Sequence, residues 1–234
     1  MDNSPYERLL QLPLFQGLTP KEMGRILGKV EFAFATFSAG ETIVCSGTSD
    51  RQLTFVLNGE VCRQTLSRTD DSADDGSTTR PYEFREYISG PFVIETYSLF
   101  GLDNRFLSTY TAVSDAGVMS VSKDALLSHL CCYPIFATNY LNMLSLRAQL
   151  YNNTLWNTRS SKGEPVDVVC DFFLRRFASL DGRKEIHITV RQLAAATRLS
   201  MPATTSALGS LSKQGIINRK AGIITIEDAH RLTR

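Results

Sequence analysis

Few residues of this chain have the type and spacing that enzyme or metal chemistry requires. The three histidines, His129, His187 and His230, show no metal-ligand spacing, so no metal site is predicted. The sequence also lacks GxSxG, P-loop, GxGxxG and HExxH motifs, which predicts that the protein is not an enzyme. The five cysteines form an odd set without CxxC spacing, which indicates buried or free thiols in a reducing compartment.

The charged residues are unevenly divided, and the last third of the chain is the basic part. From Gly163 to the end there are 11 basic and 7 acidic residues, a net charge of +4, whereas the first 162 residues carry a net charge of −3. Because the whole chain carries only +1, its bulk charge indicates neither nucleic acid nor membrane, and any such partner would have to be met by a local patch.

The elements that position this basic patch are predicted from capping signals. Thr189, with Gln192 three residues later, forms a capping box that opens a helix over 190–198. Ser200 opens a second helix, with Pro202 in its first turn, and this helix runs to residue 214. Two short helices joined by about three residues are a helix-turn-helix arrangement.

The flanks of this pair complete a small domain. An amphipathic helix is predicted over 166–180, with Gly182 as its stop, and a short extended piece follows at 186–188. After the helix pair, two runs rich in isoleucine enclose the sequence NRKAG at 218–222, which predicts a hairpin with a basic tip, a wing.

The composition of the chain predicts a globular α+β protein with a β jelly-roll domain at its N-terminal end. Hydrophobic residues make up 43% and charged residues 21% of 234 residues, which is enough for one large or two compact domains. From residue 30 to about 121, short runs of Val, Ile, Phe, Thr and Tyr alternate with glycines, as in a sandwich, jelly roll or small barrel. The acidic segment 69–79 is expected to be a solvated hairpin loop. No secretion signal and no membrane span are predicted, so a cytoplasmic location is expected.

A long helix is predicted after residue 124, and its two apolar stripes indicate a dimer. Phe136, Tyr140, Met143 and Leu150 form one stripe that can cover the sandwich. The other stripe has the steps of 3 and 4 of a coiled-coil seam, and its predicted dimer contacts are Leu141, Leu144, Ala148, Tyr151 and Leu155. The polar segment 157–165 (NTRSSKGEP) is the expected hinge.

In this order of elements, the chain resembles the Crp/Fnr family of bacterial transcription regulators. The run VRQLAAATRLSMPATTSALGSLSKQGII (190–217) lines up without gaps on the helix-turn-helix of that family. The run FSAGETIVCSGTSDRQLTFVLNGEV (37–61) looks like its first sandwich hairpins, including the turn at Gly59. The resemblance covers nearly the whole chain and implies DNA binding by a winged helix-turn-helix.

Carried over from the family, the DNA-binding positions fall on residues with mostly short side chains. Those that anchor phosphate in the family correspond to Thr189, Arg191, Ser200 and Lys220. Those that contact bases correspond to Met201, Pro202 and Ser206, where the family usually supplies Arg or Glu, so the bidentate Arg–guanine contact is missing. Hydroxyl or methyl contacts from Thr204, Thr205, Ser206 and Ser210, together with DNA shape, would have to supply sequence readout. Arg198 stands where the family often has a turn glycine, so a left-handed conformation there would cost about 1 kcal/mol.

The resemblance also places an effector pocket in the β domain, without the phosphate ligand of cyclic-nucleotide binders. In those relatives a glutamate holds the ribose and an arginine holds the cyclic phosphate. Here Glu95 occupies the glutamate position but Phe106 occupies the arginine position, and Arg105 would point to the opposite face. An unidentified effector other than cyclic AMP is therefore expected, and the predicted pocket residues are Glu95, Thr96, Tyr97, Ser98, Phe106 and Ser108.

The sequence thus predicts a homodimeric transcription regulator with four parts: a cyclic-nucleotide-binding-like β domain (1–130), a dimerisation helix (131–158), a hinge (159–165) and a winged helix-turn-helix domain (166–234). Its expected partners are a second copy and a near-palindromic double-stranded DNA site, with RNA polymerase as a further candidate and no membrane. The cofactor is left unknown. The alternative hypothesis is a redox or haem sensor that acts mainly through a protein partner, using His129, Cys131, Cys132 or a methionine.

Overall fold

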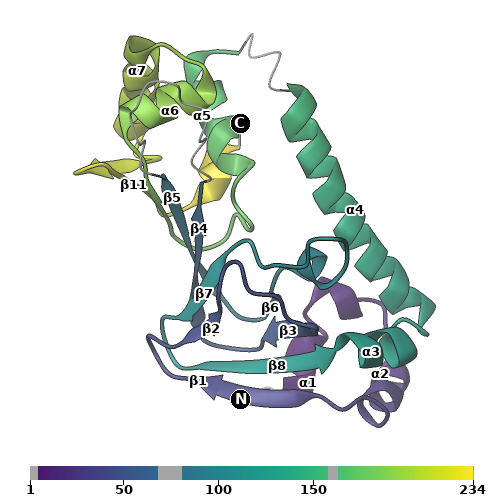
Figure 1. The fold of residues 1–234 in the computed structure, drawn as a ribbon. Helices are drawn as coiled ribbons and strands as arrows, with labels where there is room; N and C mark the ends of the chain where they lie inside the picture. The colour runs from purple at the N-terminus through teal and green to yellow at the C-terminus, as the bar shows by residue number, and fades with distance from the viewer. Residues whose placement is uncertain (1–4, 68–80, 158–162, 234) are drawn as a thin grey trace. The chain divides into compact units, whose positions relative to one another are not determined.

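The computed structural model describes residues 5–67, 81–157 and 163–233, and its contacts divide the chain into two compact units. Side chains at positions 5, 6, 150, 151 and 153–157 lie outside the description. The first unit contains residues up to Val61 and from Ser89 to Asn153, and the second contains residues 62–88 and 154–234. Each unit is described separately below (Figure 1). The predicted loop at 69–79 and most of the predicted hinge lie outside the described residues.

The first unit is a β-roll with helices at both ends of its sequence. It begins with α1 (Pro5–Leu9), the 3-10 turn η1 (Pro13–Phe15) and α2 (Pro20–Leu27). Its strands are β1 (Ala33–Phe37), β2 (Thr42–Val44), β3 (Gln52–Val56), β6 (Phe92–Val93), β7 (Thr109–Ala112) and β8 (Ala116–Ser122). A 3-10 helix, η2 (Thr96–Leu99), lies between β6 and β7. After β8 come α3 (Lys123–Ala125), the π-helical turn η3 (Leu126–Leu130) and the long helix α4 (Pro134–Asn157).

Alternation of apolar and polar residues along these strands builds the β-roll interior. Strands β1, β8, β3 and β6 form one antiparallel sheet in that order, and β2 pairs with β7. One buried cluster combines Val56 of β3, Tyr110 of β7 and Val118 of β8, so residues of both groups of strands share one interior. The turn at Gly59 has φ +84°, and a Cβ there would lie 2.4 Å from the Asp115 carbonyl oxygen, so only glycine fits. The predicted jelly-roll-like N-terminal domain is confirmed.

Helix α4 packs on the β-roll through the first of its two predicted stripes. Phe136 and Tyr140 are buried in the core, and Met143 packs partly against it. The Phe136 ring lies 5.3 Å from that of Phe15, which itself lies 5.8 Å from that of Phe55 in β3. These tilted contacts between aromatic rings fix the start of the helix to the sheet.

The second unit is a winged-helix domain extended by a hairpin from the middle of the chain. It contains α5 (Pro165–Leu174), β9 (Lys184–His187), α6 (Val190–Thr197), α7 (Met201–Lys213), β10 (Asn218–Lys220), β11 (Ile223–Ile226) and η4 (Ala229–Leu232). The hairpin strands are β4 (Glu60–Leu66) and β5 (Glu83–Ser89). Strand β5 pairs antiparallel with β9, so β4, β5, β9, β11 and β10 follow one another in one sheet.

This hairpin makes the structure differ from the linear division at residue 130. Phe84 of β5 lies opposite Ile186 of β9 and is buried in the same core as Phe172 and Phe177. The pairing with β9 satisfies the backbone groups of β5 and buries one of its faces, which explains why 62–88 groups with the C-terminal residues. The long sequence separation of β5 and β9 left no local signal for this pairing.

The first helix of the second unit is shorter than predicted. It ends at Leu174, whereas the sequence favoured a helix to Leu180. A tertiary contact explains the difference, because the backbone N–H of Ala178 donates to the carboxylate of Glu86 at 2.9 Å. The chain therefore leaves the helix before this residue, and Gly182 follows with φ +77°.

Candidate functional site

The helix-turn-helix is held by the capping residues that the sequence predicts. Thr189 caps α6 in a complete capping box with Gln192, and the Ser200 hydroxyl accepts the backbone N–H of Ala203 at the start of α7. Between the helices, Arg198 has φ 57° and ψ 28°, so the left-handed turn conformation is confirmed with an arginine in place of glycine. These contacts fix where α7 begins relative to α6.

One face of α7 packs inward and the other presents short polar side chains to solvent. Ala207, Leu208 and Leu211 are buried on the inner face. On the outer face, Met201, Thr205 and Ser206 are exposed and Ser210 is half-buried, together with the exposed Pro202. The outer face is thus composed largely of hydroxyl and methyl groups, as expected for direct readout without a long guanidinium.

One residue named for base contact is corrected by the structure. Thr204 is fully buried, and its hydroxyl donates to the backbone carbonyl of Ser200 at 3.0 Å. A threonine in a helix interior commonly makes this bond to the preceding turn. Its hydroxyl therefore serves the helix, and the prediction that Thr204 contacts bases is wrong.

The residues assigned to phosphate lie at the start of each helix and in the wing. Arg191, Ser200 and Lys220 are exposed. Thr189 is exposed too, but its hydroxyl donates to Gln192 at 2.9 Å, so its proton serves the capping box. Thr189 and Lys220 also line one groove of about 520 Å³ between the beginning of α6 and the wing, which the structure forms from residues 31 positions apart in sequence.

The exposed cations around this face have no carboxylate neighbours in ion-pair range. Within the described residues, the ion pairs of the second unit engage Arg63, Arg85, Arg175, Arg183 and Lys184. Between residues 190 and 220, all of which the structure describes, five cations are exposed and make no ion pair: Arg191, Arg198, Lys213, Arg219 and Lys220. Their charge is not neutralised by the protein, so it is available to an anionic partner.

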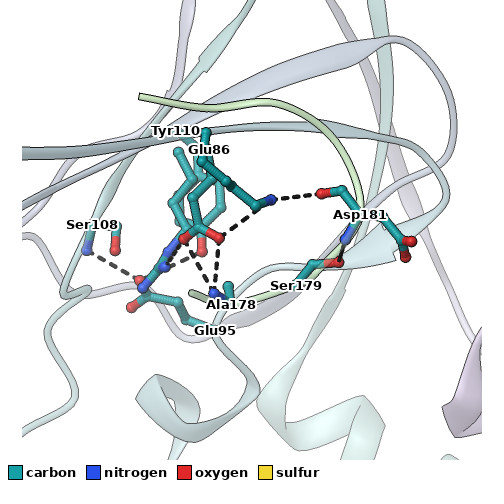
Figure 2. Close-up of polar contacts among 9 residues, drawn as sticks. Glu86, Glu95, Ser108, Tyr110, Ala178, Ser179 and Asp181 are labelled. Atoms are coloured by element: carbon teal, nitrogen blue, oxygen red, sulfur yellow. Dashed lines mark hydrogen bonds and ion pairs between the residues drawn. The ribbon is translucent and has the colours of Figure 1, made fainter. Parts of the chain in front are cut away.

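The predicted effector residues surround a buried carboxylate in the first unit. Glu95, Thr96, Ser98, Phe106 and Ser108 are buried, and Tyr97 is half-buried. The Glu95 carboxylate accepts backbone N–H groups of Leu107 at 2.7 Å and Ser108 at 3.1 Å, as Figure 2 shows for Ser108. The structure therefore brings Glu95, Ser98 and Ser108 together, while Phe106 belongs to the apolar core of the β-roll.

The arginine next to Phe106 lies on the outside, as the sequence predicts. Arg105 is exposed, and its guanidinium forms an ion pair with Asp103 at 2.9 Å. The Arg105 guanidinium is therefore not among the buried residues of the predicted pocket. The position that holds the cyclic phosphate in nucleotide-binding relatives is apolar in this chain.

Comparison with known families identifies the C-terminal part of the chain. Residues 169–234 match the model of the Crp-like helix-turn-helix domain. This part of the chain is a Crp-like helix-turn-helix domain. The predicted helix-turn-helix and its resemblance to the Crp family are thereby confirmed for these residues. No curated protein matches the chain significantly.

Several solved structures are similar to the chain at low sequence identity. The Catabolite Activator Protein of Thermus thermophilus has 19% identity and a TM-score of 0.48, over 94% of this chain and 96% of that one. DNR from Pseudomonas aeruginosa has 18% identity and a TM-score of 0.42, over 99% and 98% of the two chains. FixK2 from Bradyrhizobium japonicum has 16% identity and a TM-score of 0.43, over 87% and 96%.

The predicted dimer residues of α4 fall into three groups. Leu141 and Ala148, one heptad apart, are exposed. Leu144 lies between them but packs partly against the first core. The side chains of Tyr151 and Leu155 lie outside the described residues. An exposed apolar strip therefore borders the part of α4 that covers the β-roll.

A buried charge cluster ties the hairpin to the Crp-like domain, and the sequence analysis missed it. The carboxylate of Glu86 in β5 forms an ion pair with Arg63 of β4, lies 3.6 Å from the Lys184 ammonium of β9, and accepts the Ala178 N–H (Figure 2). Glu86 and Lys184 are fully buried. Burial lowers the pKa of Lys184, although Glu86 opposes the shift. Strand alternation could have located Glu86, which has the same inward parity as Phe84 and Ile88.

The thiols and histidines form no metal site in the described part of the chain. No group of three or more His, Cys, Asp or Glu residues there could hold a metal ion. Burial raises the pKa of Cys62 to about 11 and also raises that of Cys131. Cys170 is buried, whereas Cys45 and Cys132 are exposed. Among the described helices, none is long and apolar enough to cross a bilayer.

Proposed function

We propose that the chain is a homodimeric, sequence-specific transcription regulator that binds double-stranded DNA through α7 and the wing. The observation that carries this proposal is the set of five exposed cations without ion pairs around the Ser/Thr face of α7, in a Crp-like domain. Phosphate contacts supply most of the affinity of such a surface, while the hydroxyl face reads the major groove. The expected site is near-palindromic, and its sequence readout depends on hydroxyl contacts and DNA shape.

We propose that a second copy of the chain packs against the exposed apolar strip of α4. Leu141 and Ala148 are exposed apolar residues on one strip of α4, and Leu144 between them contributes its remaining surface. Pairing two α4 helices along this strip would remove it from water and produce a two-fold arrangement. Two α7 helices would then meet successive major grooves about one DNA turn apart.

A sensory role for the β-roll fits the same proposal, with an effector other than cyclic AMP. The absence of a guanidinium at Phe106 removes the charge that would hold a cyclic phosphate. RNA polymerase is a further proposed partner, and the cytoplasm is the proposed location. The redox alternative is less well supported, because burial disfavours the thiolate of Cys62 and Cys131.

Salt dependence of DNA binding tests the proposal. Fluorescence anisotropy with labelled promoter fragments should show affinity that falls steeply as salt rises. Lys220→Ala and Arg191→Ala should each weaken binding and flatten the log–log salt slope by about 2, because each dimer loses two phosphate contacts. Lys21→Ala, which removes an exposed lysine of α2 in the first unit, is the matched control and should change neither. Salt-independent binding, or equal effects of all three variants, would contradict the proposal.

The dimer is tested by replacing one exposed leucine. Leu141→Glu should make the protein monomeric and weaken DNA binding strongly, because two charges would face each other in the seam. Leu141 is a cleaner target than Leu144, which also contacts the β-roll core. Leu127→Glu, at another exposed apolar position in η3, is the control and should leave the mass in sedimentation velocity unchanged. A monomeric wild type at micromolar concentration would refute this part of the proposal.

A further inference from the structure

Glu95 has a combination of features that its position in a core does not explain. Its side chain is buried, with only 6% of the residue exposed, and its backbone has φ 25° and ψ 63°. Such a conformation is unfavourable for a residue with a Cβ, and the surrounding structure must enforce it. Among the described residues, no cation forms an ion pair with the Glu95 carboxylate. Burying a charged carboxylate is costly unless hydrogen bonds or an opposite charge stabilise it.

Neutral hydrogen-bond donors surround this carboxylate instead. The backbone N–H groups of Leu107 and Ser108 donate to it at 2.7 and 3.1 Å, and the Ser98 hydroxyl donates at 3.1 Å. The Tyr110 hydroxyl lies at 3.5 Å (Figure 2). Two successive amides that converge with hydroxyl groups are a recognised way to bind an anion. We call this set of four donors the cradle.

We propose that the cradle is a small-carboxylate-binding site that the chain keeps filled with its own Glu95. The glutamate acts as a tethered ligand and takes the place of a diffusible anion. The inference deepens the proposed function, on which its DNA-binding consequence rests. With Phe106 at the arginine position, the β-roll has no guanidinium there to bind a phosphate. The Glu95 carboxylate would instead occupy the hydrogen-bond donors of the pocket.

The filled cradle is connected to α4 through η2, which begins immediately after Glu95. The carbonyl oxygen of Thr96 accepts the Tyr140 hydroxyl of α4 at 2.8 Å. At the other end of η2, the carbonyl oxygen of Leu99 accepts the Lys123 ammonium at 3.2 Å. The ring of the next residue, Phe100, lies 5.9 Å from the Tyr140 ring. Loss of the anion should therefore loosen η2 and, with it, the anchor of the proposed dimer helix.

Chemical rescue tests the inference. Glu95→Gly removes the carboxylate and suits the backbone φ of 25°. This variant should have a lower Tm than the wild type, and formate or acetate should restore it in a saturable way, compared with chloride at equal ionic strength. The wild type should show no such gain. Glu41→Gly is the control, because Glu41 is an exposed glutamate that also accepts a backbone N–H, from Ser38 at 2.7 Å, and water can replace it.

The outcomes separate this inference from the proposed function. Rescue of Tm by formate without any DNA binding would support the cradle and contradict the regulator. No carboxylate-specific rescue, or a Glu95→Gly protein as stable as the wild type, would overturn the cradle. If Glu95→Gly does not fold, calorimetry on the wild type decides. Formate, acetate, inorganic phosphate and cyclic AMP should then show no saturable heat at millimolar concentration, and binding of any of them would refute a filled site.

Discussion

Removing the Glu86 carboxylate should destabilise the Crp-like domain more than any other single charge deletion in the hairpin. In Glu86→Ala, the Arg63 guanidinium and the Lys184 ammonium stay buried without their shared carboxylate, and the Ala178 N–H loses its acceptor. Breaking a buried ion pair by deleting one partner costs about 3–5 kcal/mol, because an uncompensated charge remains. Glu86 is 0% exposed, so solvent screening does not reduce this figure.

The matched control is Glu83→Ala on the same strand. Glu83 pairs with Arg85, whose side chain is 38% exposed, so its deletion should cost about 1 kcal/mol or less. Urea unfolding followed by circular dichroism would measure both losses, and hydrogen exchange of the β9 amides would locate them. Replacing Arg63, Glu86 and Lys184 together by Met, Leu and Met should recover most of the stability. Equal losses for the two single variants, or a loss below about 1 kcal/mol for Glu86→Ala, would refute the reasoning.

Three further predictions follow from groups in the second unit and its hairpin. Burial keeps the pKa of Lys184 in the folded protein below its value in the unfolded chain, so between the two values the unfolded chain binds more protons. The free energy of unfolding should therefore rise with pH across that window. Urea unfolding at several pH values should show this rise in the wild type and not in Lys184→Met. Cys62, with a pKa of about 11, should react with iodoacetamide at least about tenfold more slowly near neutral pH than the exposed Cys132, as peptide mass spectrometry would show; equal rates would contradict its burial. Gly182→Ala should cost at least about 2 kcal/mol of unfolding free energy, because its Cβ would lie 2.0 Å from a carbonyl oxygen of β5, whereas Gly215→Ala, also at positive φ but in open space, should cost only about 1 kcal/mol.

Local sequence signals predicted the Crp-like domain well, because its elements are fixed by neighbouring residues. The capping box at Thr189 and the cap at Ser200 follow from chemistry within four residues, the left-handed turn at Arg198 follows from the family resemblance, and each is found in the structure. The stripe of Phe136 and Tyr140 was equally readable from helical periodicity. These features require no knowledge of distant contacts.

Features that depend on distant residues could not be predicted in the same way. The end of α5 at Leu174 depends on Glu86, which lies 92 positions before Ala178 in the sequence. The burial of Thr204 follows from the packing of α7, although its residue type suggested a surface role. For the effector pocket, the sequence located Glu95 and Ser108, but the donation of two backbone amides to that carboxylate is visible only in three dimensions.

The proposed two-fold dimer places two copies of α7 in successive major grooves. Hydroxyl-radical footprinting on a fragment selected by the purified protein tests it most directly. Two protected half-sites with two-fold symmetry are expected, about 10 bp apart from centre to centre, and both should be lost together in Leu141→Glu. A single protected patch, or a footprint that survives unchanged in Leu141→Glu, would contradict the claim.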